Sequence, residues 1–128
     1  PFYVYTQEDL NYSNSSSRVS KEHNDKSLQN VKLKETQVEN FDSYDTILIG
    51  YPIWWGVAAW PVNTFVQEND FTNKTIIPFC TSALSGIGQS GENLSKIVNG
   101  GHWLNGHRFN SSVSVDDIKK WTDSLKND

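Results

Sequence analysis

The apolar residues of the chain gather in short runs that are separated by polar segments. Residues 47–49 form a run of isoleucine and leucine that ends at Gly50, and residues 75–80 form a second run. Runs without polar alternation are typical of strands that are buried on both faces of a parallel sheet. We therefore predict two interior strands, with Pro78 near a strand end or at a bulge, because proline cannot donate to a ladder hydrogen bond.

Helical spacing of apolar residues follows each predicted strand. Pro61 fits the first turn of one helix, Gly100 and Gly101 close the next, and Ser114 with Asp117 resembles a capping box before the last. Residues 103–109 predict a weaker third strand. The side chains at helical spacing are Val62, Phe65 and Val66 in the first helix and Leu94, Ile97 and Val98 in the second. In the last helix, Ile118, Trp121 and Leu125 are expected to form a buried stripe.

The first forty residues have a different character. Residues 2–5 are aromatic and β-prone, and we predict a strand there. Residues 11–40 contain only six apolar side chains among thirty, with a serine-rich tract at 13–17. This composition indicates an exposed helix or a surface segment that packs weakly, with residues 31–33 as a candidate edge strand.

The order strand, helix, strand, helix, strand, helix predicts a doubly wound α/β fold, with helices on both faces of a parallel sheet. A chain of 128 residues without a second compositional regime is expected to form a single domain. Ligands of such folds bind at the carboxyl ends of the strands. Residues 51–60 and 81–91 follow the two interior strands, so we expect these two loops to lie side by side and to carry the function.

Composition and charge disfavour several classes of function. Eleven basic against fifteen acidic side chains give a net charge of −4, which argues against nucleic acid because phosphate binding needs clustered lysine and arginine. The apolar runs are too short for a membrane span. One cysteine excludes an internal disulfide framework, and His102 and His107 lack a recognisable third metal ligand. We therefore expect no metal, and the sequence contains no recognisable catalytic triad.

The first loop contains the run YPIWWG at residues 51–56, with two adjacent tryptophans. Proline and glycine keep the backbone of such a loop fixed and open. The run therefore suits a platform for a flat conjugated ring, with backbone N–H groups aimed at ring heteroatoms. The alternative is that one or both indoles pack down onto the sheet, and the pattern alone does not decide between the two.

The second loop, residues 81–91, is rich in serine and glycine. Small residues let a ligand approach the backbone closely, and hydroxyl groups offer hydrogen bonds without charge. The loop is not a P-loop, because no lysine follows its glycines. Gly86 and Gly88 also lack the third glycine of a dinucleotide-binding fingerprint.

Together, these stretches closely resemble the short-chain flavodoxin-like flavoproteins of bacteria. The matching residues are 44–56 (YDTILIGYPIWWG), 74–81 (KTIIPFCT) and 85–88 (SGIG), together with Phe71 and Trp121. The resemblance implies a flavodoxin-like fold with sheet order 2-1-3-4-5 and FMN at the carboxyl edge of the sheet. The cofactor-binding residues that it implies are Pro52, Ile53, Trp54, Trp55 and Gly56 in the first loop and Thr81, Ser82, Ser85 and Gly86 in the second.

The sequence departs from this family at the phosphate of the cofactor. A flavodoxin holds the FMN phosphate in a loop of hydroxyl residues and glycine after its first strand, and the serine tract at 13–17 has no glycine. We therefore interpret residues 2–5 as the second strand, and expect the first strand and helix to precede Pro1. Residues 1–128 would then be one N-terminally truncated flavodoxin-like domain. In the order 2-1-3-4-5 the first strand is internal, so its absence would leave a gap in the sheet beside the edge strand. The edge strand itself, another chain or upstream residues could close this gap.

The resemblance implies an FMN-binding protein in electron transfer or NAD(P)H/quinone-type oxidoreduction. We expect a cytoplasmic protein with a small-molecule or protein redox partner, and a homodimer. Electron or hydride transfer through flavin requires no acid, base or nucleophile, so no catalytic residue is assigned. Whether the chain is an enzyme stays open; an active one would be an FMN-dependent oxidoreductase.

Two alternatives remain on the sequence alone. One is a truncated module with weak or no FMN binding that acts as a non-catalytic or interaction domain. The other is an aromatic surface for sugars or a protein partner, built from Trp54, Trp55 and Trp60. The first predicts weak FMN binding, because charge-assisted contacts to the phosphate are missing. The second predicts that Trp54→Ala loses the partner, with no flavin involved.

Overall fold

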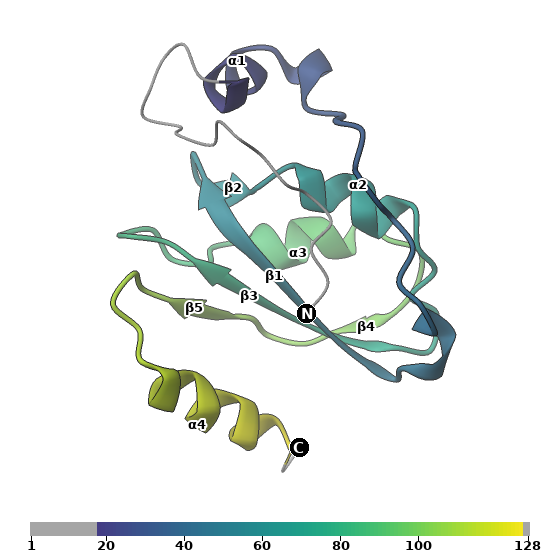
Figure 1. Cartoon of the computed structure of the whole chain (residues 1–128), viewed down its shortest axis with the longest axis vertical. Coiled ribbons are helices and arrows are strands. Elements are labelled where there is room, and N and C mark those ends of the chain that lie inside the picture. Colours follow the sequence, from purple (N-terminus) through teal and green to yellow (C-terminus); the bar gives the residue numbers. More distant parts are fainter. Residues whose placement is uncertain (1–17, 127–128) are drawn as a thin grey trace.

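The computed structural model describes residues 18–126 (Figure 1). The helices are α1 (Arg18–Asn24), α2 (Pro61–Gln67), α3 (Ser90–Ser95) and α4 (Val115–Leu125), with the 3-10 turns η1 (Lys26–Leu28) and η2 (Phe41–Ser43). The strands are β1 (Thr46–Trp54), β2 (Val57–Ala58), β3 (Thr75–Thr81), β4 (His102–Trp103) and β5 (His107–Phe109). The strand predicted at residues 2–5 lies outside the described residues.

The strand β3 is the centre of the sheet. It runs parallel to β1 on one side, with Thr46 opposite Thr75 and Pro52 opposite Thr81, and parallel to β4 and β5 on the other. The strand β2 joins β1 in an antiparallel hairpin, which gives the order β2-β1-β3-β4 with β5 also beside β3. The predicted α/β fold with a mostly parallel sheet is confirmed.

Pro78 accounts for the division of the third predicted strand into two. The strand β4 pairs with Thr75 and Ile76, β5 pairs with residues 79–81, and Pro78 falls between the two pairings. A Cβ atom at Gly106 would lie 2.9 Å from the Pro78 carbonyl oxygen and 3.1 Å from its Cγ. Because proline offers no N–H to a ladder, the segment between β4 and β5 does not pair with Pro78 and passes around its ring. The prediction of one strand over residues 103–109 was therefore wrong.

Among the described residues, only one face of the strand β1 is covered. Its side chains alternate, so that Ile49 and Tyr51 are buried whereas Leu48 is 46% exposed. The prediction that this strand is buried on both faces was therefore wrong. Within the described residues, the edge of β1 that faces away from β3 is paired only at Ile53 and Trp54, by β2.

The strand β1 is also longer than predicted. It continues past Gly50 to Trp54, so part of the predicted loop 51–60 is strand and hairpin. Phe79 explains why glycine suits the middle of this strand. Its ring crosses Gly50 so closely that a Cβ atom there would lie 2.2 Å from a ring carbon.

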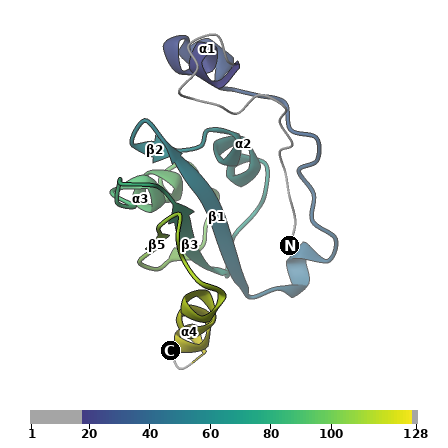
Figure 2. The ribbon, with the colours of Figure 1, turned by 60° about the vertical axis from the view of Figure 1, so that its left-hand side comes forward.

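The main core lies between the sheet and the helices α2 and α3, which cover the same face (Figure 2). The helix α2 begins at Pro61, as predicted. The helix α3 ends at Ser95, so the short helix predicted to continue through Ile97 and Val98 was wrong at its end, and Ile97 is 38% exposed. The buried core residues are Leu33, Ile49, Tyr51, Ile53, Ala58, Val62, Phe65, Val66, Phe71, Ile76, Cys80 and Leu94.

The helix α4 lies at the opposite face of the sheet from α2 and α3 (Figure 2). Ser114 caps it as predicted, because its Oγ accepts the Asp117 N–H at 3.1 Å. Trp121 holds it through an aromatic cluster with Phe79, His107 and Phe109. No residue of α4 is buried, so the expected buried stripe was wrong. Ile118 is 39% exposed, and Trp121 and Leu125 are half-buried.

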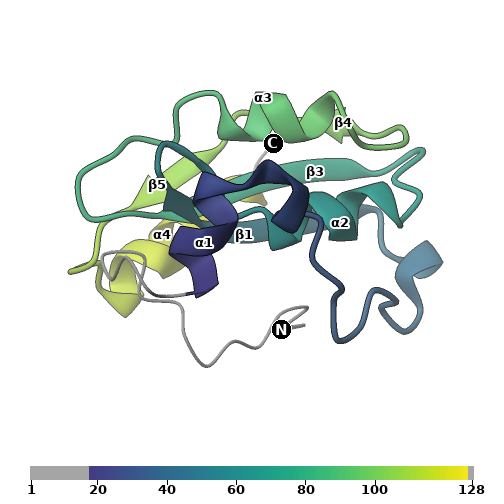
Figure 3. The same ribbon diagram turned by 90° about the horizontal axis from the view of Figure 1, so that it is seen from above.

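The polar segment before β1 packs more firmly than its composition predicts. The helix α1 lies beside the hairpin end of β1 (Figure 3), where Val19 is fully buried and Glu22 is almost so. Leu33 reaches the main core, but residues 31–33 are not a strand. The expectation of weak packing was therefore wrong for these residues. None of the described helices is long and apolar enough to cross a membrane.

Candidate functional site

The two candidate segments start from adjacent positions at the carboxyl edge of the sheet. Pro52 of β1 stands opposite Thr81 of β3, and Phe109 of β5 stands opposite Thr81 on the other side. The Ser82 N–H donates to the Phe109 carbonyl oxygen at 3.2 Å. The edge therefore brings together the hairpin, the second loop and the end of β5, as parallel strands require.

The hairpin turns through two residues, Trp55 and Gly56. Trp54 pairs directly with Val57, and both turn residues have a positive φ, 47° for Trp55 and 81° for Gly56. A turn of this kind matches the twist of the strands, and its residues are normally asparagine and glycine. A bulky residue at positive φ carries a strain of about 1–3 kcal/mol. The surroundings of Trp55 must therefore hold it in place.

The two indoles of the predicted platform lie in different environments. Trp54 is 5% exposed and packs edge-on against Trp60, with the ring centroids 4.8 Å apart. Trp55 is 38% exposed and lies nearly parallel to His23 at 4.0 Å and to Trp60 at 6.0 Å. Trp54 therefore packs onto the fold, which was the alternative to the platform, whereas Trp55 keeps part of its surface open.

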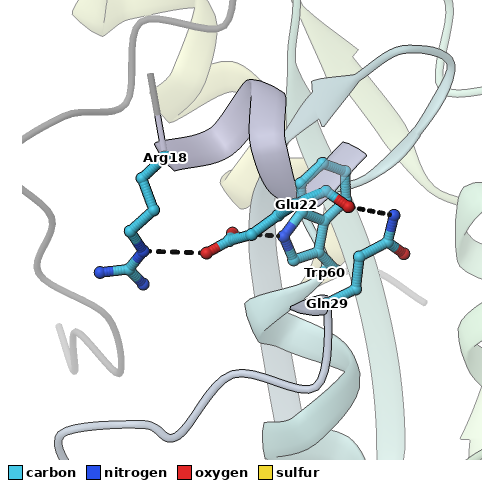
Figure 4. Close-up of polar contacts among 4 residues, drawn as sticks. All are labelled: Arg18, Glu22, Gln29 and Trp60. Atoms are coloured by element: carbon cyan, nitrogen blue, oxygen red, sulfur yellow. Dashed lines mark hydrogen bonds and ion pairs between the residues drawn. The ribbon is translucent and has the colours of Figure 1, made fainter. Parts of the chain in front are cut away.

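A buried carboxylate attaches α1 to Trp60 (Figure 4). Glu22 Oε1 accepts a hydrogen bond from Trp60 Nε1 at 2.8 Å, and Glu22 Oε2 accepts one from Arg18 Nε at 2.9 Å. The Gln29 side-chain amide donates to the Glu22 carbonyl oxygen at 3.1 Å. A carboxylate is costly to bury unless its oxygens are paired, as both are here. The network fixes α1, and with it His23, beside the hairpin turn.

The sequence contained only part of the signal for this network. Arg18 and Glu22 are four residues apart, which is the spacing of an ion pair on one face of a helix. The partner Trp60 lies 38 residues further along the chain. A contact at this separation depends on the tertiary fold, so the role of Glu22 was missed.

In the structure, β3 ends at Thr81 and α3 begins at Ser90, so the second loop is reduced to residues 82–89, which are open. Leu84 is 94% exposed, and Ser85 and Gly86 are exposed as well. A Cβ atom at Gly86 would come no closer than 3.9 Å to an atom of the fold, and one at Gly56 would meet nothing within 4 Å. Both glycines therefore present their backbone to open space, which is what a closely approaching ligand needs.

Arg108 organises the second loop and was not among the predicted site residues. Its Nε donates to Ser82 Oγ at 2.8 Å, and its Nη2 donates to the carbonyl oxygens of Ser82 at 3.1 Å and Ala83 at 3.0 Å. Ser82 Oγ in turn donates to the Ser85 carbonyl oxygen. The Ser82 hydroxyl therefore supports the loop itself, and Thr81, Ser85 and Gly86 are the more exposed of the predicted contacts.

Two buried ionisable groups lie just below this edge. Tyr51 and Cys80 are register partners on β1 and β3. Burial raises the pKa of the Tyr51 hydroxyl, against the effect of its 2.8 Å hydrogen bond to Ser90 Oγ. Burial also raises the pKa of the Cys80 thiol, against the nearby charge of Arg108. Both groups are therefore neutral near pH 7 and add no charge to the floor of the edge.

A cavity of about 440 Å³ opens between α1, the hairpin, α2 and α3. Trp55 contributes to its wall, but residues 81–88 do not. It is therefore a separate hollow from the space in front of the second loop. The residues that line it are His23, Lys26, Gln29, Trp55, Val57, Ala58, Trp60, Asn63, Ser90, Asn93, Leu94 and Ile97.

Within residues 18–126, no group of three or more His, Cys, Asp or Glu side chains is arranged to hold a metal ion. His102 belongs to β4 and His107 to β5, where His107 takes part in the aromatic cluster beneath α4. The chemistry available at the edge of the sheet is therefore that of backbone groups, hydroxyls, indoles and one guanidinium.

Comparisons with known proteins agree on one family. The sequence profile described as "Flavodoxin" matches residues 1–125. Among solved structures, a candidate flavoprotein of Bacteroides uniformis is 37% identical with a TM-score of 0.76, and covers 93% of this chain and 74% of its own. A candidate flavoprotein of Bacteroides eggerthii is 36% identical with a TM-score of 0.70, and covers 95% of this chain and 75% of its own. A comparison with curated proteins finds no match.

Proposed function

Because this chain belongs to the flavodoxin family, we propose that it binds the isoalloxazine ring of FMN at the carboxyl edge of its sheet and passes electrons through it. The observation that carries the proposal is the register of Pro52 with Thr81. This register starts an aromatic hairpin and an open loop of small residues from adjacent positions on neighbouring strands. A planar ring is the ligand shape that such a pair of walls fits.

The residues at the edge fit the ring of a flavin. Gly56 and Gly86 have open space in front of their backbones, and the exposed Thr81 offers a hydroxyl. Trp55 supplies the partly open aromatic surface. Backbone and hydroxyl groups can meet the carbonyl and nitrogen atoms of the ring without adding charge. The ring therefore has a matching set of walls among the described residues.

The phosphate of FMN has no such match within residues 18–126. The second loop carries hydroxyls and glycines, but they follow β3, and Arg108 is already bonded to Ser82 and Ala83. The serine tract at 13–17 lies outside the described residues. We therefore expect recognition through the ring to dominate the affinity of this chain.

The flavin supplies the redox chemistry, and the protein sets its surroundings. Trp54 and Trp60 make the hairpin side apolar and exclude water from it. Arg108 brings a positive charge to the side of the second loop. A cation near the ring favours added negative charge, so Arg108 should make the bound flavin easier to reduce.

The test is a fluorescence titration of the purified chain with FMN and, separately, with riboflavin, which lacks the phosphate. We expect both to bind, with affinities within about tenfold of each other, because few charge-assisted phosphate contacts are available within residues 18–126. Trp55→Ala should weaken both ligands. Tyr44→Ala is the matched control, since Tyr44 is an exposed aromatic residue before the amino end of β1.

Failure of both ligands to bind would contradict the proposal and favour the truncated module that does not hold flavin. Equal losses in the Trp55→Ala and Tyr44→Ala variants would contradict the assigned position. Four expectations stay predictions: a redox partner, a homodimer, an enzymatic activity and a location in the cytoplasm.

A further inference from the structure

The cavity between α1, the hairpin, α2 and α3, here called the α1 cavity, has an amphipathic lining. Val57, Ala58, Leu94 and Ile97 give it an apolar wall beside the indole of Trp55. Its volume of about 440 Å³ is in the range of small-molecule sites. A ligand that fills it would therefore need an apolar body of one or two rings.

The polar part of the α1 cavity includes one positively charged ammonium group and several amides that can donate hydrogen bonds. Lys26 reaches it from η1, Asn63 from α2 and Asn93 from α3, and no Asp or Glu side chain lines it. Within residues 18–126, none of these three side chains has a hydrogen-bond or ion-pair partner. An ammonium group and two amides that converge on one hollow are suited to bind an anion with several acceptor atoms.

Two costly features of the fold border this cavity. Glu22 is buried to hold Trp60 and α1 together, and Trp55 is held at a positive φ of 47°. His23 and Lys26 are positioned by the first feature, and the indole of Trp55 by the second. Strained and buried charged groups of this kind gather where a precise arrangement of side chains is needed.

We propose that the α1 cavity binds a small organic anion, a carboxylate on a planar apolar body, with Lys26 facing the carboxylate. The flat body would lie along Leu94 and Ile97 beside Trp55. The inference rests on the cavity and its lining, not on flavin binding, because residues 82–89 take no part in this site. Trp55 borders both sites, so a molecule held here would lie beside the proposed flavin.

Isothermal titration calorimetry of the full chain with 2-naphthoate, without FMN, tests the proposal. We expect saturable binding at one site, and binding of the neutral counterpart 2-naphthamide that is about tenfold weaker. Lys26→Gln should weaken 2-naphthoate by a similar factor and leave 2-naphthamide unchanged. Lys119→Gln removes an exposed lysine of α4 and is the matched control, with no expected change.

A second measurement locates the ligand. Asn93→Phe fills the cavity from an exposed position on α3, so it should abolish binding of 2-naphthoate without unfolding the chain. Three results would overturn the proposal: no binding of 2-naphthoate, equal binding to the Lys26→Gln variant, or stoichiometric displacement by riboflavin. The last result would assign the cavity to the flavin ring, whereas failure of flavin binding alone would leave the anion site standing.

Discussion

The two walls of the proposed flavin crevice are held in different ways. The hairpin wall rests on packing: Trp54 and Trp60 are buried, and the Glu22 carboxylate of α1 is hydrogen-bonded to Trp60. The wall formed by the second loop projects from the fold, with Leu84 almost fully exposed. Its shape depends on polar contacts, chiefly those of Arg108.

This difference makes the hairpin wall the stable one and the second loop the adaptable one. A wall made of interlocked indoles cannot move without losing buried apolar contact, so it fixes where a ligand lies. A loop held by a few hydrogen bonds can open at a cost of about 1 kcal/mol for each bond. We therefore expect the hairpin to set the position of a bound ring and the second loop to close over it.

The largest expected effect is a difference between the two walls in their contribution to the free energy of unfolding. Trp54→Ala should lower the free energy of unfolding by about 3–5 kcal/mol, because it removes a buried indole from the cluster with Trp60. Leu84→Ala is the matched change in the second loop and should stay within about 0.5 kcal/mol of the parent, since Leu84 is exposed. Urea denaturation of the two variants measures both values. Similar losses in the two variants would refute the comparison.

A smaller effect is expected when the contacts of the second loop are removed. Arg108→Gln deletes the guanidinium that holds Ser82 and Ala83, so the loop should open at a cost of about 1 kcal/mol. Limited proteolysis should then cut within residues 82–89 faster than in the parent. The midpoint of urea denaturation should change little, because Ile87 is the one residue of this loop that packs against the main core, and it is only partly buried.

The informative control is Arg18→Gln, which removes a guanidinium from the hairpin side. Arg18 pairs with Glu22 but lies far in sequence from the second loop. This variant should leave cleavage of residues 82–89 unchanged. Faster cleavage in both variants would mean that Arg108 has no special role in that loop.

The sequence predicted the parts of the molecule that depend on local patterns. The interior strand β3, the start of α2 at Pro61 and the Ser114 cap follow from apolar runs, proline geometry and short-range hydrogen bonds. The meeting of the two segments at the sheet edge also followed, because parallel strands end at the same edge. The resemblance to flavodoxins rested on these same stretches, and the family is confirmed.

What the sequence did not predict depends on distant partners. Glu22 in a polar segment becomes buried only because Trp60 offers it an N–H group. Leu48 is exposed although its run resembles an interior strand, since no described element covers that face of β1. The residues of the predicted binding set were read from motifs, but their environments, such as buried Trp54 and exposed Gly86, are set by the tertiary fold.

The smallest expected effect concerns pH and compares Tyr51 with Cys80, one below each wall. Both have a pKa raised by burial, so each stabilises the fold below its ordinary pKa and loses that contribution as the pH rises through the raised value. The thiol, with an ordinary pKa of 9.0, should act before the phenol, at 10.0. Unfolding free energies measured by urea at pH 7 and at about pH 9.5 should therefore fall less in Cys80→Ala than in Tyr51→Phe. An equal fall in both variants would show that the thiol does not govern the first alkaline step.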